Sequence, residues 1–264
     1  MERIVIYNTI DVNYLIKSIK KKKLDIFIYQ FPISKEIKAL NNLNKIKTIF
    51  YIHSSFFYWI YTSWYRVLDI YKQYHNSRYI ISIIPLENDY LFKKWGINSA
   101  FFDNFLTYDY NCIIPSDLTK KNILLIGRAY DKFKRFDLGI KSIEYIKNNL
   151  PDVKLLIISK ATKVEALQNC IHNLNLEKYV FFENYSSEPS IYFKDVSLNF
   201  LTSIAEAYPL ALSETKIYGI PNIILGLDYV SLAKNGTVII YDDSPETLAK
   251  ESIKIIYNNL LKRQ

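Results

Sequence analysis

Short apolar runs alternate with longer amphipathic segments along the first half of the chain. The runs are rich in Ile, Tyr and Phe and predict strands, whereas apolar residues at helical spacing predict helices. The predicted strands are residues 4–7, 24–29, 48–52, 79–84 and 99–102. The predicted helices are 12–22, one capped by Ser34, 59–74, and 86–95, which Gly96 closes. This alternation indicates a parallel sheet with crossover helices on its faces.

The second half repeats the pattern more regularly. Its predicted strands are residues 123–127, 154–159, 179–183, 197–200, 222–225 and 237–241, and its predicted helices are 137–149, 163–174, 190–194, 208–218 and 245–261. Residues 108–121 between the halves are polar and contain Pro115, which is typical of a linker. We therefore predict an α/β protein with two Rossmann-like, doubly wound parallel sheets. The predicted domains are residues 1–118, which is short, and residues 119–264.

Composition and charge narrow the function classes. Half of the 264 residues are hydrophobic, which favours a folded protein, and the formal net charge of +8 suits anionic partners. Cys112 and Cys170 lie far apart and indicate reduced thiols in a cytoplasmic protein. The three histidines, His53, His75 and His172, have no metal-site spacing. No window reaches the roughly 18 apolar residues of a membrane span.

Several common motifs are missing from the sequence. Neither half carries a G-x-G-x-x-G fingerprint or a Walker loop, so a dehydrogenase or P-loop NTPase is not supported. No RNA-binding signature is present, and we expect no nucleic-acid partner. The run Lys20–Lys23 is either a solvated helix end or a contact with an anionic membrane. The aromatic stretch 56–65 is either core or an acceptor- or membrane-facing surface.

Two short stretches of the second half carry candidate chemistry. Arg128 and Lys134 follow a predicted strand, and such a pair either is a solvated loop or binds a diphosphate, which an arginine fork and a lysine point charge suit. Glu206 and Glu214 flank the start of a predicted helix, whose first backbone N–H groups form an anion site. Carboxylates accept hydrogen bonds from sugar and ribose hydroxyls, although this spacing alone arises often by chance.

Polar residues also end two predicted strands of the first half. His53 follows one of them, and Asp103-Asn104 follows another. Ligands of such sheets bind at the carboxyl ends of the strands. An isolated histidine in this position has either a structural or a functional role, and both readings stay open.

Together and in this order, the residues of the second half resemble a known family. They are similar to the retaining nucleotide-sugar glycosyltransferases of family 4, the "glycosyl transferases group 1" domain with the GT-B architecture. The resemblance rests on Ile126-Gly-Arg128, on Lys134-Arg-Phe-Asp137 and on Ser203–Glu214 continuing to Tyr218-Gly-Ile-Pro221. It covers residues 120–260, and it implies that the two sheets face each other across a cleft.

The resemblance implies a role for each matching residue. Arg128 and Lys134 match the basic pair that binds the donor diphosphate and stabilises the departing nucleoside diphosphate. Glu206 matches the glutamate that contacts the donor sugar, and Glu214 the one that hydrogen-bonds the ribose. His53 matches a histidine close to the reacting centre.

Further residues complete the implied site. Gly127 and the backbone around Tyr208, Pro209 and Leu210 would meet the sugar and phosphates. Tyr185 is a candidate for the base pocket, and Asn104 for the first-domain wall. A bound metal is not needed in this architecture, so we expect none. The chain departs from the family pattern in its short first half, and in Ile158-Ser-Lys-Ala161, where the family has a Gly-x-Gly segment. It is either a compact variant or part of a longer protein.

The sequence thus predicts a metal-independent retaining glycosyltransferase. The expected donor is a nucleotide-diphosphate sugar, with UDP-sugars first, and the expected acceptor is a glycan or a lipid-linked molecule in cell-surface polysaccharide or glycoconjugate synthesis. The expected location is the cytoplasm, with peripheral contact at the inner face of an anionic membrane. Two alternatives are a non-catalytic nucleotide-sugar- or glycan-binding subunit and a nucleotide-sugar epimerase.

Overall fold

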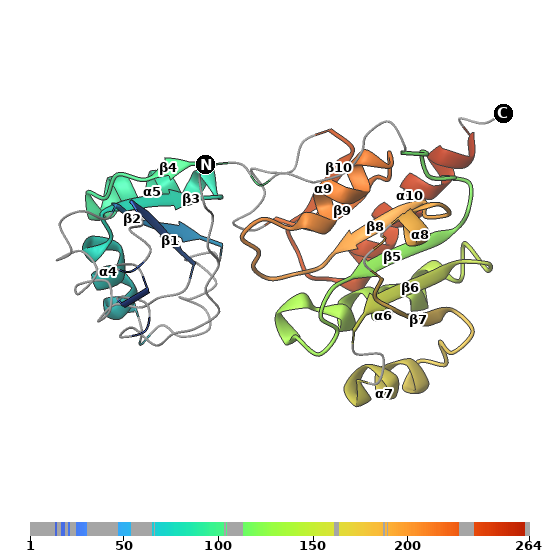
Figure 1. Cartoon of the computed structure of the whole chain (residues 1–264). Coiled ribbons are helices and arrows are strands. Elements are labelled where there is room, and N and C mark those ends of the chain that lie inside the picture. Colours follow the sequence, from blue (N-terminus) through green and yellow to red (C-terminus); the bar gives the residue numbers. More distant parts are fainter. Residues whose placement is uncertain are drawn as a thin grey trace. The chain divides into compact units, whose positions relative to one another are not determined.

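The chain forms two compact units, Met1–Asn104 and Phe105–Gln264. The structure is a computed structural model that describes residues 14, 17–18, 21, 25–30, 47–53, 65, 67–102, 104, 113–160, 164–186, 188, 190–226 and 235–261. Each unit contains its own parallel sheet, as Figure 1 shows. The predicted α/β class is confirmed, whereas the facing of the two sheets across a cleft stays a prediction.

The first unit contains a four-stranded parallel sheet in the order β1-β2-β3-β4. Its elements are β1 (Ile26–Tyr29), β2 (Lys47–Ile52), α4 (Val67–Asn76), β3 (Tyr79–Ser82), α5 (Pro85–Trp95) and β4 (Ala100–Phe101). These elements confirm four of the predicted strands. The predicted strand 4–7, the helix at Ser34 and most of the aromatic stretch 56–65 lie outside the described residues, as do most residues of the Lys20–Lys23 run.

The helix α5 ends where the sequence places its end. Gly96 adopts a left-handed conformation with φ 65°, and its backbone N–H points back to the carbonyls of Leu91 and Phe92. Glycine adopts this conformation without the steric penalty of a Cβ atom, which is why the helix stops there.

The second unit contains a six-stranded parallel sheet in the order β10-β9-β8-β5-β6-β7. Its strands are β5 (Asn122–Ile126), β6 (Lys154–Ser159), β7 (Val180–Asn184), β8 (Leu198–Leu201), β9 (Asn222–Leu225) and β10 (Thr237–Ile240). Its helices are η3 (Lys132–Lys134), α6 (Phe136–Ile146), α7 (Glu165–Asn173), α8 (Ser190–Phe193), α9 (Leu210–Ile217) and α10 (Pro245–Leu261). All six predicted strands are present, in register as parallel pairs.

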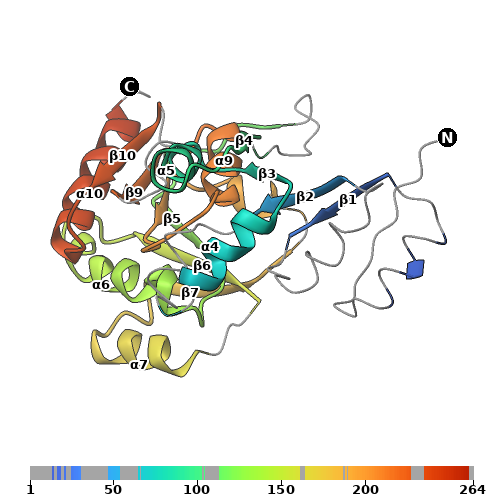
Figure 2. The same ribbon diagram turned by 90° about the vertical axis from the view of Figure 1, so that its left-hand side faces the viewer.

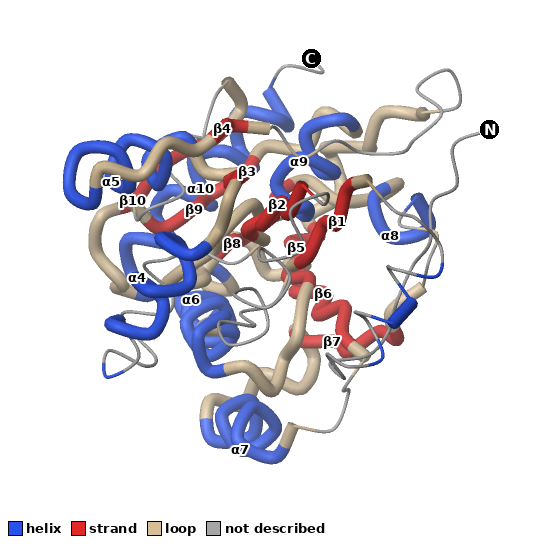
Figure 3. Tube along the Cα trace, turned by 60° about the vertical axis from the view of Figure 1, so that its left-hand side comes forward, coloured by secondary structure: helices blue, strands red, loops and turns tan. Residues whose placement is uncertain are grey.

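Helices cover both faces of this sheet. Successive side chains of a strand point to opposite faces, so each strand contributes apolar side chains to both layers. In β5, Ile123 and Leu125 pack into the larger core cluster with α6, α7 and α10, whereas Leu124 packs into a second cluster with Phe193 of α8. Figure 2 shows α10, α6 and α7 in a row. Figure 3 shows α6 and α8 on opposite sides of the strands. Burial on both faces explains why these strands are continuous apolar runs rather than alternating ones.

The two units divide after Asn104, rather than after residue 118 as the sequence predicts. Ile113 and Leu118 pack against the second cluster of the second unit. Ser116 is held there too, because its hydroxyl donates to the Val196 carbonyl at 2.6 Å and its N–H to the Tyr218 carbonyl at 2.9 Å. Ile113, Ser116 and Leu118 therefore belong to the second unit, through apolar packing and through the two hydrogen bonds of Ser116.

Candidate functional site

The strand order of the second unit places a candidate site at the carboxyl ends of its two central strands, β5 and β8. From β5 the chain continues to β6 and β7 on one side, and then returns to β8, β9 and β10 on the other. The order therefore reverses between β5 and β8, which is the position where open α/β sheets bind ligands. The two loops that leave these strands, 127–135 and 202–209, carry Arg128, Lys134 and Glu206.

Gly127 begins the first of these loops. Its φ of 152° lies in a region that residues with a side chain rarely adopt, and its N–H donates to the Ile158 carbonyl of β6 at 3.0 Å. A Cβ atom there would approach the Phe136 ring to 3.6 Å, which is ordinary contact. The backbone conformation, and not lack of space, is therefore the reason for glycine.

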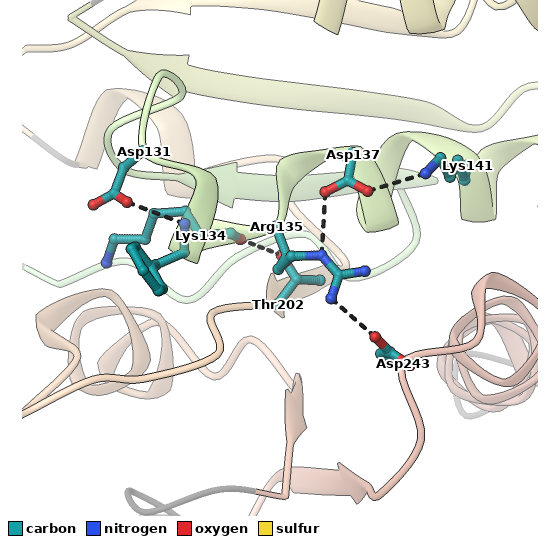
Figure 4. Close-up of polar contacts among 8 residues, drawn as sticks. Asp131, Lys134, Arg135, Asp137, Lys141, Thr202 and Asp243 are labelled. Carbon is teal, nitrogen blue, oxygen red and sulfur yellow. Dashed lines mark hydrogen bonds and ion pairs between the residues drawn. The ribbon is translucent and has the colours of Figure 1, made fainter. Parts of the chain in front are cut away.

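The loop then forms the short helix η3, which presents Lys134. Asp131 caps its start by accepting a hydrogen bond from the Phe133 N–H at 3.1 Å. Arg135 ends it with φ 49°, a left-handed conformation that is unusual for a residue with a side chain. The Arg135 guanidinium reaches Asp137 at 3.3 Å and Asp243 at 2.9 Å, as Figure 4 shows. The hydrogen bond to Asp243 raises the pKa of Arg135, and the same bond lowers the pKa of Asp243.

Lys134 and Glu206 form an ion pair that joins the two loops. Their side chains are 19% and 13% exposed, so the pair is shielded from water but still reachable. The Ser203 hydroxyl donates to the same Glu206 oxygen, Oε1, at 2.6 Å. One residue of the predicted basic pair, Lys134, thus contacts one residue of the predicted acidic pair, Glu206, directly in this structure.

Two hydrogen bonds involving backbone atoms reinforce the connection. The Thr202 hydroxyl donates to the Lys134 carbonyl at 2.8 Å (Figure 4), and the Ile204 N–H donates to the Phe133 carbonyl at 2.8 Å. The backbone on which Lys134 sits is therefore anchored to the loop after β8, which restricts the positions that its ammonium group can take.

Arg128 lies in the same loop as Lys134 and is more open. Its side chain is 61% exposed, and its Nη2 atom forms an ion pair with Asp131 Oδ2 at 2.9 Å. The loop that follows β5 therefore carries a shielded cation, Lys134, and an accessible cation, Arg128, at the carboxyl ends of the strands. This arrangement can hold a diphosphate group.

The helix α9 begins later than the sequence predicts. It starts at Leu210 with Pro209 as its N-cap, whereas the prediction began it at Tyr208. A residue before proline is disfavoured in the helical region, and proline has no N–H to offer an anion. Glu214 is therefore the fifth residue of α9, about one turn from its start. Leu210 is 44% exposed, whereas Pro209 is buried.

The remaining predicted residues lie at other strand ends. Tyr185 follows β7, is 48% exposed, and has the Lys160 ammonium 5.6 Å from its ring centroid. His53 follows β2 in the first unit, with its ring 4.2 Å from that of Tyr51, and partial burial lowers its pKa. Asn104 follows β4 and is partly buried. The closeness of His53 and Asn104 to Arg128 stays a prediction.

Asp131 and Ser203 are site residues that the sequence patterns do not single out. Each lies a few positions from a predicted residue, Asp131 between Arg128 and Lys134, and Ser203 before Glu206. A short polar residue just before a turn is a capping signal, and it could have identified Asp131. Ser203 has no such signal, because its hydroxyl donates to the Glu206 side chain. No three His, Cys, Asp or Glu side chains of the described ranges gather closely enough to hold a metal ion. Within those same ranges, no helix has the length and apolar character needed to cross a membrane.

Known structures share this fold. The chain is similar to Staphylococcus aureus TarM, with 23% identity and a TM-score of 0.78 over 95% of this chain and 51% of that one. It is also similar to Anabaena HepE in complex with UDP, with 14% identity and a TM-score of 0.76 over 94% and 72%. A third is WaaB, a lipopolysaccharide outer core galactosyltransferase, with 19% identity and a TM-score of 0.72 over 94% and 70%. These are GT-B glycosyltransferases, and the chain has the same fold.

The chain spans about half the length of TarM. No curated protein sequence matches it. The family described as "Glycosyl transferases group 1" matches residues 113–264, which include both loops of the site and the whole six-stranded sheet. The chain therefore belongs to the glycosyl transferases group 1 family.

Proposed function

We propose that the chain carries the donor site of a retaining, metal-independent glycosyltransferase. The donor is a nucleotide-diphosphate sugar, and the acceptor is a glycan or a lipid-linked molecule of the cell surface. One observation carries the proposal: the shielded Lys134–Glu206 ion pair joins two loops at the switch point of the sheet, with the exposed Arg128 in the same loop.

Charge development explains the need for this arrangement. When the bond between the sugar and the diphosphate breaks, negative charge grows on the phosphate oxygen that leaves. Arg128 and Lys134 would meet that charge with preorganised cations, in a site where Lys134 is already partly dehydrated. Both cations are ion-paired, Arg128 with Asp131 and Lys134 with Glu206, so a diphosphate would bind through their remaining N–H donors, without a metal ion. Glu206 has two carboxylate oxygens, so it can hold Lys134 through Oε1 and accept from a sugar hydroxyl through Oε2.

The donor and acceptor classes rest on similar proteins and on the chemistry of the site. HepE has been solved with UDP and with UDP-glucose, and TarM with UDP and α-GlcNAc-glycerol. Tyr185, at the end of β7, offers an aromatic face on which a base such as uracil can stack. Glu214 on α9 would accept from the ribose hydroxyls, in line with the family pattern.

A turnover assay tests this function. The chain is incubated with UDP-, GDP- and ADP-sugars and a mixture of glycan and lipid-linked acceptors, and NMR follows both the nucleotide and the anomeric proton. We expect release of a nucleoside diphosphate and a product with the anomeric configuration of the donor. An inverted product contradicts retention, conversion of the donor to its epimer supports the epimerase, and binding without turnover supports the non-catalytic subunit.

Location is proposed separately, as cytoplasmic with peripheral contact at the inner face of the membrane. The cytoplasmic location rests on the separated Cys112 and Cys170, and the membrane contact on the Lys20–Lys23 run and the aromatic stretch 56–65. We expect the chain to sediment with vesicles of phosphatidylglycerol at low salt and to be released at high salt. A chain that stays in solution with these vesicles contradicts the proposal.

A further inference from the structure

Within the loop after β5, Asp131 contacts both the Arg128 side chain and the backbone that carries Lys134. Its side chain is 12% exposed, although it lies three positions from Arg128, which is 61% exposed. Carboxylate oxygen Oδ2 pairs with Arg128 Nη2 at 2.9 Å, and Oδ1 accepts from the Phe133 N–H at 3.1 Å. The two oxygens therefore have different partners.

Its backbone adds two further bonds to the same neighbours. The Asp131 N–H donates to the Arg128 carbonyl at 2.9 Å, and the Asp131 carbonyl accepts from the Lys134 N–H at 2.9 Å. Figure 4 shows Asp131 beside the turn that carries Lys134. One residue thus closes the turn after Arg128 and begins the turn that ends at Lys134.

A capping role alone does not explain an aspartate here. Ser or Asn caps a helix start about as well as Asp, and the cap needs only the one oxygen that faces Phe133. The second oxygen holds a guanidinium that is otherwise open to solvent. This contact uses one of about five N–H donors of the arginine, so most of the fork remains available for an anion.

We propose that Asp131 is a positioning residue for the donor diphosphate. It holds the Arg128 guanidinium in a binding-ready orientation and, through the cap, fixes the short helix that presents Lys134. A long exposed side chain loses rotamer freedom when it binds a ligand, and a side chain that is oriented in advance loses less. The inference rests on the proposed function, because it needs a diphosphate as the ligand.

The variant Asp131→Asn separates the two roles of the residue. The amide oxygen can still cap Phe133, whereas the amide group cannot replace the charge that faces Arg128. We expect calorimetry to give about five-fold weaker UDP binding, the upper end for a partly exposed ion pair. The melting temperature in circular dichroism should not change. Asp152→Asn is the matched control, because Asp152 also forms an ion pair, with Lys121 at 3.1 Å, just before β5 and β6 begin and therefore at the opposite ends of these strands from the site.

Two further measurements test whether Asp131 acts through Arg128. In an Arg128→Ala background, Asp131→Asn should weaken UDP binding no further, because the guanidinium that it orients is gone. With UMP as the probe, the loss should be smaller than with UDP, since one phosphate is missing. A purely structural role would lower affinity equally in both backgrounds and for both nucleotides.

The outcomes separate this inference from the proposed function. If Arg128→Ala weakens UDP binding and Asp131→Asn does not, the inference is wrong and the donor site stands. Equal losses for Asp131→Asn in the wild-type and Arg128→Ala backgrounds also overturn the inference. If the wild-type chain binds none of UDP, GDP and ADP, the proposed donor site and the inference both fall.

Discussion

Two glutamates, one in each unit, lie a few residues after a strand and differ in what surrounds them. Glu87 lies in the first turn of α5 and accepts from Ser82, the last residue of β3. Glu206 lies in the loop after β8 and accepts from Ser203, two residues after that strand ends. Glu87 is fully buried and also accepts from the Tyr74 hydroxyl at 3.2 Å. Glu206 is 13% exposed and pairs with Lys134.

The comparison shows that two features decide whether a carboxylate near a strand end stabilises the fold or binds a ligand. They are the burial of the carboxylate and the group that pairs with it. The Glu87 carboxylate is completely buried and accepts from two neutral hydroxyls, those of Ser82 and Tyr74. This Glu87 cluster therefore has a structural role and connects β3, α4 and α5. Burial, followed by the nearby charge of Glu87, raises the pKa of Tyr74 well above its ordinary value, so its hydroxyl stays a donor. A cation and partial exposure leave the Glu206 pair open to a charged ligand. The following experiments test this contrast.

The largest effect is expected for Lys134→Ala. Removing a cation that meets charge in the transition state lowers kcat by about 10²–10³-fold, as for other preorganised donors. Sugar transfer from the preferred donor measures the effect. Lys254→Ala is the control, because it removes an exposed, ion-paired lysine of the same unit. Transfer at the wild-type rate by Lys134→Ala would remove Lys134 from the proposed site.

Glu87→Ala should affect stability rather than donor binding. It removes the buried carboxylate that accepts from the hydroxyls of Ser82 and Tyr74, which destabilises the first unit by about 1–3 kcal/mol. All three tryptophans lie in the first unit, so urea unfolding followed by tryptophan fluorescence reports on that unit. Asp89→Ala, on the exposed face of the same helix, is the control. A weaker UDP affinity in Glu87→Ala, without loss of stability, would reverse the roles assigned here.

The two serines give a smaller and matched pair of effects. Ser203→Ala loses a hydrogen bond to a carboxylate that orients Lys134, and we expect transfer to fall about ten-fold, the size of a hydrogen bond to a charged group. Ser82→Ala should instead lower the urea midpoint of the first unit and leave UDP affinity unchanged. If Ser82→Ala slows transfer as much as Ser203→Ala does, the contrast between the units is wrong.

Arg135→Gly should have the smallest effect on stability. Glycine relieves a left-handed conformation that costs roughly 1–2 kcal/mol, while the lost ion pairs to Asp137 and Asp243 contribute roughly 0–1 kcal/mol each. The two changes nearly cancel, so the melting temperature in calorimetry should move by only about 2–4 °C. A much larger drop would show that these exposed ion pairs stabilise the unit as strongly as the buried Glu87 cluster does.

The sequence predicts the elements of the second unit closely and the first unit less completely. The bounds of β6, β9 and α10 match the prediction, because buried parallel strands are short continuous apolar runs and Pro245 marks the start of a helix. The start of α9 is two residues off, because Pro209 disfavours the helical conformation at Tyr208. The unit boundary differs because Ile113, Ser116 and Leu118 contact residues of the second unit that lie far away in the sequence.

The candidate site is likewise only partly predictable from the sequence. The residue types of Arg128, Lys134 and Glu206 and their places after strands are visible in the sequence. The Lys134–Glu206 pair is not, because it joins residues 72 positions apart. Neither are the contacts that make Asp131 and Ser203 part of the site.

The sequence by itself determined the α/β class and most of the described strands and helices, because these depend on neighbours within a few positions. It also singled out candidate residues for a diphosphate site. The tertiary structure decided that β5 lies beside β8 and that Lys134 meets Glu206. It also decided that Glu87 is buried and Glu206 is not. These outcomes depend on strand order and on packing between segments far apart in the chain, which no local pattern encodes.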